Sequence, residues 1–210
     1  MPTLHLGVLA SGNGSNLQAI LDAIAAGTLD ADVKIVIANV PGAKVLERAA
    51  NSGAPRALMP HRDYPDRASF EAALSQTLDA AGAEWVVLAG FMRVLTPVFI
   101  ARHHRRILNI HPALLPAFPG VHAQAQALAY GAKISGCTVH FVDDGVDCGP
   151  IIAQRAVPVQ CDDSVESLSA RILREEHQLY VQVLQWLAAD RVRWSCDSDS
   201  PRPKISIEPA

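Results

Sequence analysis

Short apolar runs alternate with longer segments of helical periodicity along this chain, and that alternation narrows its possible folds more than any other feature. Strands that alternate with helices are typical of an α/β protein with a mostly parallel sheet. The sequence therefore predicts a single α/β domain, with a twisted sheet flanked by helices. Strands are expected at residues 4–10, 33–39, 56–59, 85–89, 107–110, 137–142 and 150–157, and helices at about 15–27, 44–51, 67–81, from 97 onward, 122–130 and 164–189.

Composition argues for a globular chain and against several classes of protein. Half of the 210 residues are hydrophobic, yet no apolar run approaches the ~18 residues of a membrane-spanning helix. The net charge of −3 provides no basic field that would attract nucleic acid. The four cysteines include no CxxC pair, which favours a reduced, cytoplasmic location. Residues 195–210 are polar and rich in proline, so they are expected to form a flexible tail.

The first candidate site is the turn SGNGSN, residues 11–16, between the first strand and the first helix. Gly12 and Gly14 allow positive φ and close approach of the backbone, and the helix start presents N–H groups at its positive dipole end. The turn is therefore a candidate cradle for a phosphate or carboxylate, and the alternative is a plain strand-to-helix turn. Ser15 and Gln18 have the spacing of a capping box.

The second candidate site lies where the strand at residues 107–110 runs into a segment with three prolines, residues 112–119. Such a segment is stiff, and it would hold Asn109 and His111 at the edge of the sheet where open α/β folds bind ligands. On an extended strand these two side chains point to the same face. They are candidates to stabilise an oxyanion and move a proton. A histidine bonded to backbone carbonyls is an equally open reading.

An acidic turn, DDGVDCGP at residues 143–150, follows the strand at 137–142. Acidic residues with glycines after a strand are commonly only a turn. If this turn lies beside His111, an aspartate would orient the imidazole and raise its pKa. The sequence alone does not establish that they are adjacent.

The last helix carries a carboxylate on its apolar stripe. Glu176 falls on that stripe, so it must be paired or must face a ligand cavity, whereas Glu175 beside it is expected to be solvated. A salt bridge at the edge of the stripe is the alternative for Glu176. The helix is expected to begin with a capping box of Asp163 and Glu166. His140 is expected to be a hydrogen-bonded histidine of the core.

Taken together, these motifs resemble one family, the folate-dependent phosphoribosylglycinamide formyltransferases of purine synthesis. The set of Asn109, His111 and Asp147 is by itself shared with methionyl-tRNA formyltransferase and formyltetrahydrofolate deformylase. The segment SGNGSNLQAI (11–20) narrows the resemblance to the phosphoribosylglycinamide formyltransferases. The match runs from residue 4 to about 190. Its segments are SGNGSNLQAI (11–20), VVLAGFMRVL (86–95), NIHPALLP (109–116), TVHFV (138–142), DCGP (147–150) and EEH (175–177).

This resemblance implies the formyltransferase fold, in which a Rossmann-like first half (about residues 1–105) binds a substrate phosphate and residues 106–194 carry catalysis and folate binding. It implies transfer of the formyl group of 10-formyltetrahydrofolate to the amine of glycinamide ribonucleotide (GAR), which gives formyl-GAR and tetrahydrofolate. The amine would attack directly. Asn109 and His111 would stabilise the tetrahedral oxyanion, and Asp147 would tune His111.

The resemblance also implies which residues hold the two substrates. The expected GAR contacts are Gly14, Ser15, Asn16, Leu17, Gln18 and Glu176. The expected contacts of 10-formyltetrahydrofolate, a co-substrate, are Arg67, Met92, Arg93, Val94, Leu95, Asn109, Val142, Asp143, Asp144, Gly145, Val146 and Asp147.

Two other functions remain open at this point. One is a formyltetrahydrofolate hydrolase, although such enzymes usually carry an additional N-terminal regulatory domain. The other is a binding module for folate or nucleotide without catalysis, which leaves the Asn-His-Asp set unexplained. No metal, nucleic acid or membrane partner is expected, and the protein is expected to be a monomer or a homodimer.

Overall fold

The computed structural model describes residues 3–195 and 202–209. Its contacts divide the chain into two compact units, Met1–Asn109 and Ile110–Ala210. The boundary falls inside strand β5 (Ile107–His111). Within the described ranges, no helix is long and apolar enough to cross a membrane.

The first unit is built on parallel strands. They are hydrogen-bonded in the order β3-β2-β1-β4-β5, and all four pairings are parallel. Because the strands are parallel, the loops after β1, β2, β4 and β5 leave the same edge of this sheet. The bounds are β1 (Leu4–Ala10), β2 (Ala31–Ala38), β3 (Arg56–Leu58) and β4 (Trp85–Leu88).

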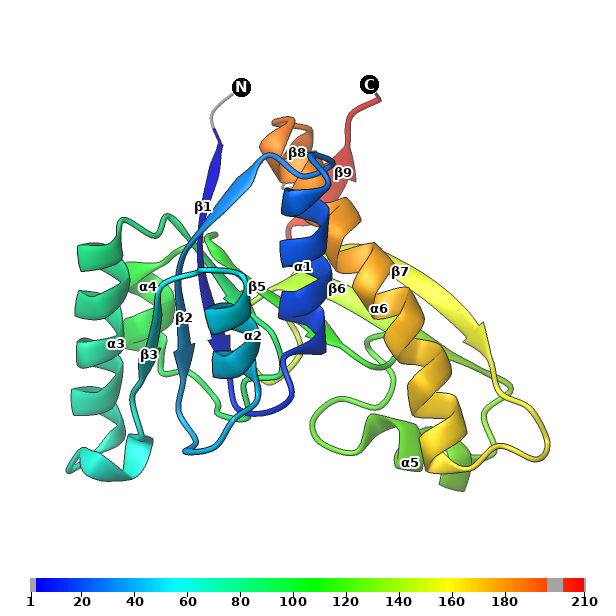
Figure 1. The fold of residues 1–210 in the computed structure, drawn as a ribbon. Coiled ribbons are helices and arrows are strands. Elements are labelled where there is room, and N and C mark those ends of the chain that lie inside the picture. Colours follow the sequence, from blue (N-terminus) through cyan, green and yellow to red (C-terminus); the bar gives the residue numbers. More distant parts are fainter. Residues whose placement is uncertain (1–2, 196–201, 210) are drawn as a thin grey trace. The chain divides into compact units, whose positions relative to one another are not determined.

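Helices cover both faces of these strands. In Figure 1, α1 and α2 lie on one side and α3 and α4 on the other. Apolar side chains on the strands and on the inner faces of the helices, such as Leu6, Ile20 and Leu74, are completely buried. This burial holds the layers together. The helices are α1 (Ser15–Ala25), α2 (Val45–Asn51), the short 3-10 helix η1 (His61–Asp63), α3 (Arg67–Ala81) and α4 (Pro97–Arg102).

The first helix does not begin with the expected capping box. Gly14 is the N-cap residue, with φ of 73°, and no side chain caps the helix. A Cβ atom at Gly14 would lie 2.5 Å from Cγ2 of Val45, in α2. The close approach of α2 therefore requires glycine at this position, and the turn leaves the backbone N–H groups of the first helical turn uncapped by side chains.

The second unit pairs β6 (Ile134–Phe141) with β7 (Ile151–Pro158) in antiparallel fashion. Helix α6 (Val165–Ala188) packs on both strands, and α5 (Ala123–Tyr130) packs on α6. The capping box at the start of α6 is formed by Ser164 and Ser167, not by Asp163 and Glu166. Asp163 instead accepts a hydrogen bond from the Ser167 hydroxyl and pairs with Arg171. The two serines form the capping box because a hydroxyl group can both donate and accept a hydrogen bond.

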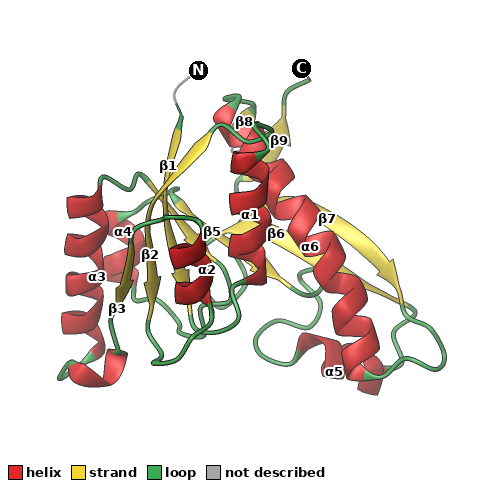
Figure 2. Cartoon of the chain, in the orientation of Figure 1, coloured by secondary structure: helices red, strands yellow, loops and turns green. Residues whose placement is uncertain are grey.

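The C-terminal segment differs from the expected flexible tail. Strands β8 (Val192–Ser195) and β9 (Lys204–Ile207) form an antiparallel pair, visible in yellow in Figure 2. Apolar residues face each other across it, as Trp194 does Ile205, and the Trp194 ring lies 4.5 Å from that of Phe141. The prediction of a flexible tail is wrong for the described part, because alternating apolar residues outweigh the prolines. Residues 196–201 and 210 lie outside the described residues.

The predicted fold class is confirmed, since the elements alternate as expected and most strand pairings are parallel. Differences at element ends are small. For example, β2 begins at Ala31 and not at residue 33.

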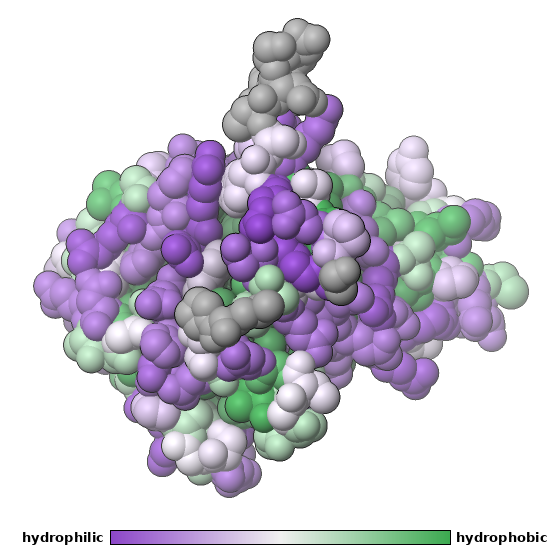
Figure 3. Space-filling model, turned by 90° about the horizontal axis from the view of Figure 1, so that it is seen from above, coloured by the Kyte–Doolittle hydropathy of each residue, from purple (hydrophilic) through white to green (hydrophobic). Residues whose placement is uncertain are grey.

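Hydrophilic residues, shown in purple, cover most of the face seen in Figure 3.

Candidate active site

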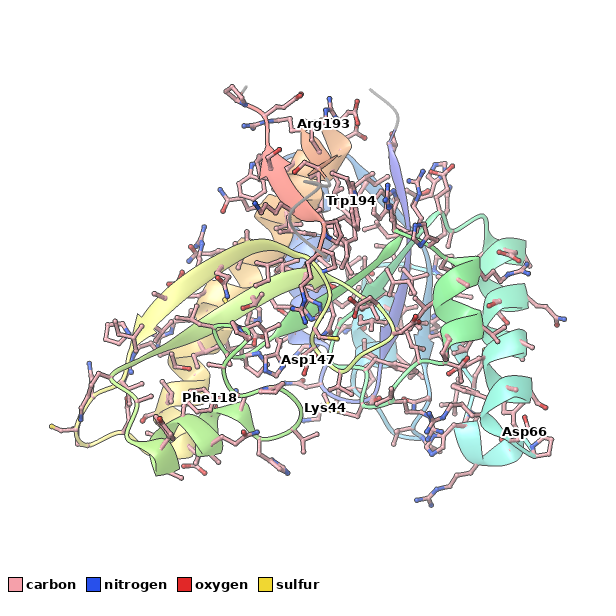
Figure 4. All side chains as sticks on the ribbon, turned by 180° about the vertical axis from the view of Figure 1, so that it is seen from behind. Lys44, Asp66, Phe118, Asp147, Arg193 and Trp194 are labelled. Atoms are coloured by element: carbon pink, nitrogen blue, oxygen red, sulfur yellow. The ribbon has the colours of Figure 1, made fainter. Side chains whose placement is uncertain are left out.

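His111, at the end of β5, faces Asp147 in the loop between β6 and β7. The His111 Nδ1 atom lies 3.2 Å from Oδ2 of Asp147, and Nε2 lies 2.8 Å from the carbonyl oxygen of Phe118. The backbone N–H of Gly120 donates to the same carboxylate at 2.8 Å. Figure 4 labels Asp147 and Phe118. The structure therefore brings together two residues that the sequence could not place side by side.

Burial and charge act on His111 in opposite directions. Its side chain is only 4% exposed, and burial lowers the pKa of His111 below its usual value, although the negative charge of Asp147 works against this. The aspartate raises the pKa of His111, as the sequence led us to expect, but desolvation of the ring exceeds this effect. Both ring nitrogens nevertheless face hydrogen-bond acceptors, and only the doubly protonated ring can donate to both.

Asp147 is surrounded by groups that favour its ionised form. Burial acts to raise the pKa of Asp147, but hydrogen bonds from His140 and Gly120 and the nearby histidines lower it overall. The Nε2 atom of His140 lies 3.7 Å from Asp147, and its Nδ1 lies 2.8 Å from the Phe141 carbonyl oxygen. His140 is thus a buried histidine, as expected, and it also helps to hold the aspartate as a carboxylate.

The turn after His111 is fixed by one buried threonine. The hydroxyl of Thr138, in β6, donates to the Ala113 carbonyl oxygen at 2.7 Å. The Thr138 hydroxyl oxygen itself accepts from the Leu115 N–H at 3.1 Å and from the Gln154 side chain at 2.9 Å. The Leu115–Pro116 peptide bond within this turn is cis. Sequence reasoning did not identify Thr138, whose only signal is a polar residue inside an apolar strand.

Asn109 lies two residues before His111 on β5 and is half-buried. Because the side chains of a strand alternate between its faces, the Asn109 amide projects to the same side as the imidazole. This gives the strand an amide donor and an imidazole at its carboxyl end. Such a pair can stabilise negative charge that develops on a carbonyl oxygen.

The expected phosphate turn is clamped by an arginine that sequence reasoning missed. Arg48, in α2, donates to the Asn13 carbonyl oxygen at 2.8 Å, to Oδ1 of Asn13 at 3.0 Å and to Oε1 of Gln18 at 3.2 Å. The turn therefore has a fixed shape and a positive charge beside it, as an anion site requires. Gly14, Asn16 and Leu17 are buried, whereas Ser15 and Gln18 are half-buried.

The segment expected to bind folate in the first unit, Met92–Leu95, follows β4 and has no regular secondary structure. Its Met92 N–H donates to Oγ of Ser11 at 2.9 Å, so the segment is joined to the turn at residues 11–16. The guanidinium of Arg93 lies 5.8 Å from the centre of the Phe70 ring. Arg67 is exposed at the first position of α3. Arg67 is thus accessible to a negatively charged ligand, whereas Arg93 is half-buried.

The loop of residues 142–147 in the second unit borders a cavity. Asp143 accepts hydrogen bonds from the Gly145 N–H at 3.3 Å and the Cys148 thiol at 3.1 Å, which shape the loop. The cavity has a volume of about 520 Å³. Strand β9 contributes Lys204 and Ile205 to its wall, which sequence reasoning did not anticipate. Its lining includes Leu115, Pro116, Pro119, Asp143, Val146, Asp147, Cys148, Ile151, Arg202, Lys204 and Ile205.

Glu176 is buried on the inner face of α6, as its place on the apolar stripe predicts, and is 7% exposed. Its negative charge adds to burial in raising the pKa of Cys137 to about 12. Glu175 differs from expectation, because it is half-buried and pairs with Arg155 at 3.0 Å.

In the described part of the chain, no group of three or more histidine, cysteine, aspartate or glutamate side chains could hold a metal ion.

Comparison with known proteins gives matches over most of the chain. Residues 4–184 match the formyl transferase family. The chain is 41% identical over 190 residues to the phosphoribosylglycinamide formyltransferase of Escherichia coli, with 90% of each protein covered. It is 48% identical over 185 residues, or 87% of its length, to the trifunctional purine biosynthetic protein adenosine-3 of Drosophila melanogaster, but spans only 14% of that protein.

A solved structure agrees with these sequence matches. The crystal structure of glycinamide ribonucleotide transformylase 1 from Symbiobacterium toebii superimposes with a TM-score of 0.92 at 46% identity, covering 98% of this chain and 94% of the other. Sequence and fold therefore point to the same group of proteins. The chain belongs to the formyl transferase family, among the phosphoribosylglycinamide formyltransferases.

Proposed function

We propose that this protein transfers the formyl group of 10-formyltetrahydrofolate to the amine of GAR, giving formyl-GAR and tetrahydrofolate in purine biosynthesis. The observation that carries the proposal is the buried pair of His111 and Asp147, 3.2 Å apart, at the end of the strand that also presents Asn109. Acyl transfer needs hydrogen-bond donors where negative charge develops, and the His111 ring, held by Asp147, and the Asn109 amide would supply them. The relatives named above support the choice of substrates.

In the proposed mechanism, the amine nitrogen of GAR attacks the formyl carbon and its electron pair forms the new C–N bond. Negative charge then develops on the formyl oxygen. Nε2–H of His111 exchanges the Phe118 carbonyl for this oxygen, since Nδ1 is held by Asp147, and the Asn109 amide is the second donor. The bond to N10 of the folate breaks, and the proton lost by the amine passes to N10 through water.

The proposed binding residues fall into one group for GAR and one for the folate. We propose that the backbone of the turn at Gly14–Gln18 holds the phosphate of GAR, with Arg48 beside it, and that Glu176 contacts the ribose or glycinamide end. Arg67, Met92–Leu95, Asn109 and the loop of residues 142–147 would hold the folate. No step in this mechanism uses a metal.

The test is the release of tetrahydrofolate from 10-formyltetrahydrofolate, followed spectrophotometrically with and without GAR. We expect turnover only when GAR is present, and loss of turnover in His111→Ala. His104→Ala is the matched control, because His104 is exposed near the end of α4. Equal turnover without GAR would assign the hydrolase reaction instead. Binding of both ligands without turnover would leave only the binding module.

We further propose a cytoplasmic location, where the free thiols of Cys137, Cys148 and Cys161 would stay reduced. Whether the enzyme is a monomer or a homodimer stays a prediction, and sedimentation equilibrium distinguishes the two.

A further inference from the structure

Two side chains hold the segment Met92–Leu95 from its two ends. At its start, Oγ of Ser11 accepts from the Met92 N–H at 2.9 Å and donates to Oδ1 of Asn39 at 2.7 Å. At its end, the carboxylate oxygens of Glu71 accept from the Thr96 N–H at 3.1 and 3.2 Å. Glu71 also accepts from the Thr96 hydroxyl. The shape of a segment without regular secondary structure depends on such anchors.

Between these two hydrogen-bonded ends, backbone N–H and C=O groups of the segment are not used within the described part of the protein. The N–H and C=O groups of Arg93, Val94 and Leu95 make no hydrogen bond to other described residues. Backbone groups fixed in place but unpaired are suited to bind a planar heterocycle with alternating donors and acceptors, which the pterin ring of a folate presents. Their spacing is useful only if both ends of the segment stay in position.

Glu71 is an unusual residue to find in that place. It lies on α3, is only 4% exposed, and forms no ion pair within the described part of the chain. A buried carboxylate is costly unless hydrogen bonds compensate it. Here Thr96 supplies them, and the Thr96 hydroxyl in turn caps α4 by accepting from the Phe99 N–H. The Glu71 carboxylate is thus held by hydrogen bonds at Thr96, directly after the segment Met92–Leu95.

We infer that Glu71 is a positioning residue for the folate, because it fixes the backbone of Val94 and Leu95 through Thr96. This inference rests on the proposed function, in that it takes Met92–Leu95 to be a folate-binding segment. Glu71 itself need not touch the ligand.

The test compares three variants of Glu71 with a matched control on the same helix. Ser75 is also buried on α3, at 5% exposure, and its hydroxyl bonds His103 at 3.2 Å, at the far end of α4. Ser75→Ala therefore removes a buried link between the same two helices, away from the segment. We expect Glu71→Ala to raise KM for 10-formyltetrahydrofolate about tenfold, as loss of a hydrogen bond to a charged group predicts. The KM for GAR and kcat should change by less than about twofold, and Ser75→Ala should leave both KM values unchanged.

Two conservative variants separate positioning from general stability. Gln can accept from the Thr96 N–H and donate to its hydroxyl, so Glu71→Gln should restore the folate KM to within about twofold of wild type. Glu71→Asp withdraws the carboxylate by one methylene and should raise this KM several-fold, about fivefold, and it serves if Glu71→Ala does not fold. An unchanged folate KM in the Ala or Asp variant, or an equal rise in the KM for GAR, would overturn the inference.

Direct binding distinguishes failure of this inference from failure of the proposed function. Calorimetric titration with tetrahydrofolate requires no turnover. If wild-type protein binds tetrahydrofolate but transfers no formyl group, the proposed reaction fails, and weaker binding by Glu71→Ala still supports the inference. If wild type and Glu71→Ala bind tetrahydrofolate equally, the inference fails whatever the activity.

Discussion

At the scale of single residues, the environment of His111 combines opposing demands. Its two ring nitrogens face acceptors, which favours the charged ring, while burial favours the neutral one and lowers its pKa. Burial is the larger effect on the ring, and the carboxylate of Asp147 acts against it. A ligand that brings negative charge to Nε2 would act in the same direction as the carboxylate.

Replacing Asp147 tests that balance directly. In Asp147→Asn the negative charge that works against burial is absent, so the pKa of His111 should fall further below its usual value. An NMR titration of the His111 ring resonances measures this. Asp144→Asn, an exposed change in the same loop, is the control and should leave the titration unchanged. A higher pKa in Asp147→Asn would contradict our account of the pair.

Asn109→Ala tests the proposed oxyanion donor. Loss of one such donor typically lowers turnover by about 10²–10³, so we expect a fall in kcat of this order with only a modest change in the affinity for GAR. Steady-state kinetics together with a binding titration of GAR measure the two effects. A large loss of affinity at unchanged kcat would refute a role in the transition state.

At the scale of elements, the turn between β1 and α1 depends on the packing of α2. Gly14 has positive φ and lies against Val45, whereas a Cβ atom at Gly12 would meet nothing within 4 Å. We expect Gly14→Ala to lower both the stability of the protein and its affinity for GAR, because strain and a clash distort the turn. Gly12→Ala, the matched control, should be far milder in both. Urea unfolding and a GAR titration of both variants decide this.

Which elements the sequence can predict depends on how local their cause is. Periodicity and end signals are local, so the helix from Arg67 to Ala81 and its stop at Gly82 agree with expectation. The capping box of α6 was predicted at Asp163 and Glu166, whereas Ser164 and Ser167 form it and Asp163 bonds the Ser167 hydroxyl and Arg171. Strand β9 was missed because its partner β8 supplies the apolar contacts, and proline content concealed the alternation in the sequence KISI.

The site shows the same limit. Asn109 and His111 share a strand, so the sequence predicts that they share a face. Asp147 reaches His111 only through the packing of β6 and the turn held by Thr138, which no local pattern specifies. Arg48 and Glu71 were not predicted for the same reason. Each acts on a loop distant in sequence through contacts that only the folded chain brings about.

At the scale of the whole molecule, two buried histidines make stability depend on pH. Burial lowers the pKa of His103 in the first unit and of His111 in the second. In the unfolded chain both titrate near about 6.5, so below this pH the unfolded state takes up protons that the folded state does not bind. Stability should therefore fall as the pH drops from about 7 to 5. The lowered pKa of Asp147 gives no loss in this window, because its carboxylate stays ionised in both states there.

The urea midpoint at several pH values measures this dependence. His103→Gln keeps a polar partner for Ser75 but does not titrate, so its midpoint should vary less with pH than that of wild type. A wild-type midpoint that stays constant or rises as the pH falls from 7 to 5 would contradict the lowered pKa of these two histidines.

Strand β5 has a consequence for any attempt to divide this protein. The boundary between the compact units falls between Asn109 and Ile110, so a cut there puts the amide donor on one polypeptide and the imidazole on the other. Fragments 1–109 and 110–210 would each carry only part of the proposed catalytic set. Formyl transfer in a mixture of the two fragments would then occur only when they associate. If each fragment were fused to one of two other proteins, the rate of formyl transfer would report whether those proteins bind each other.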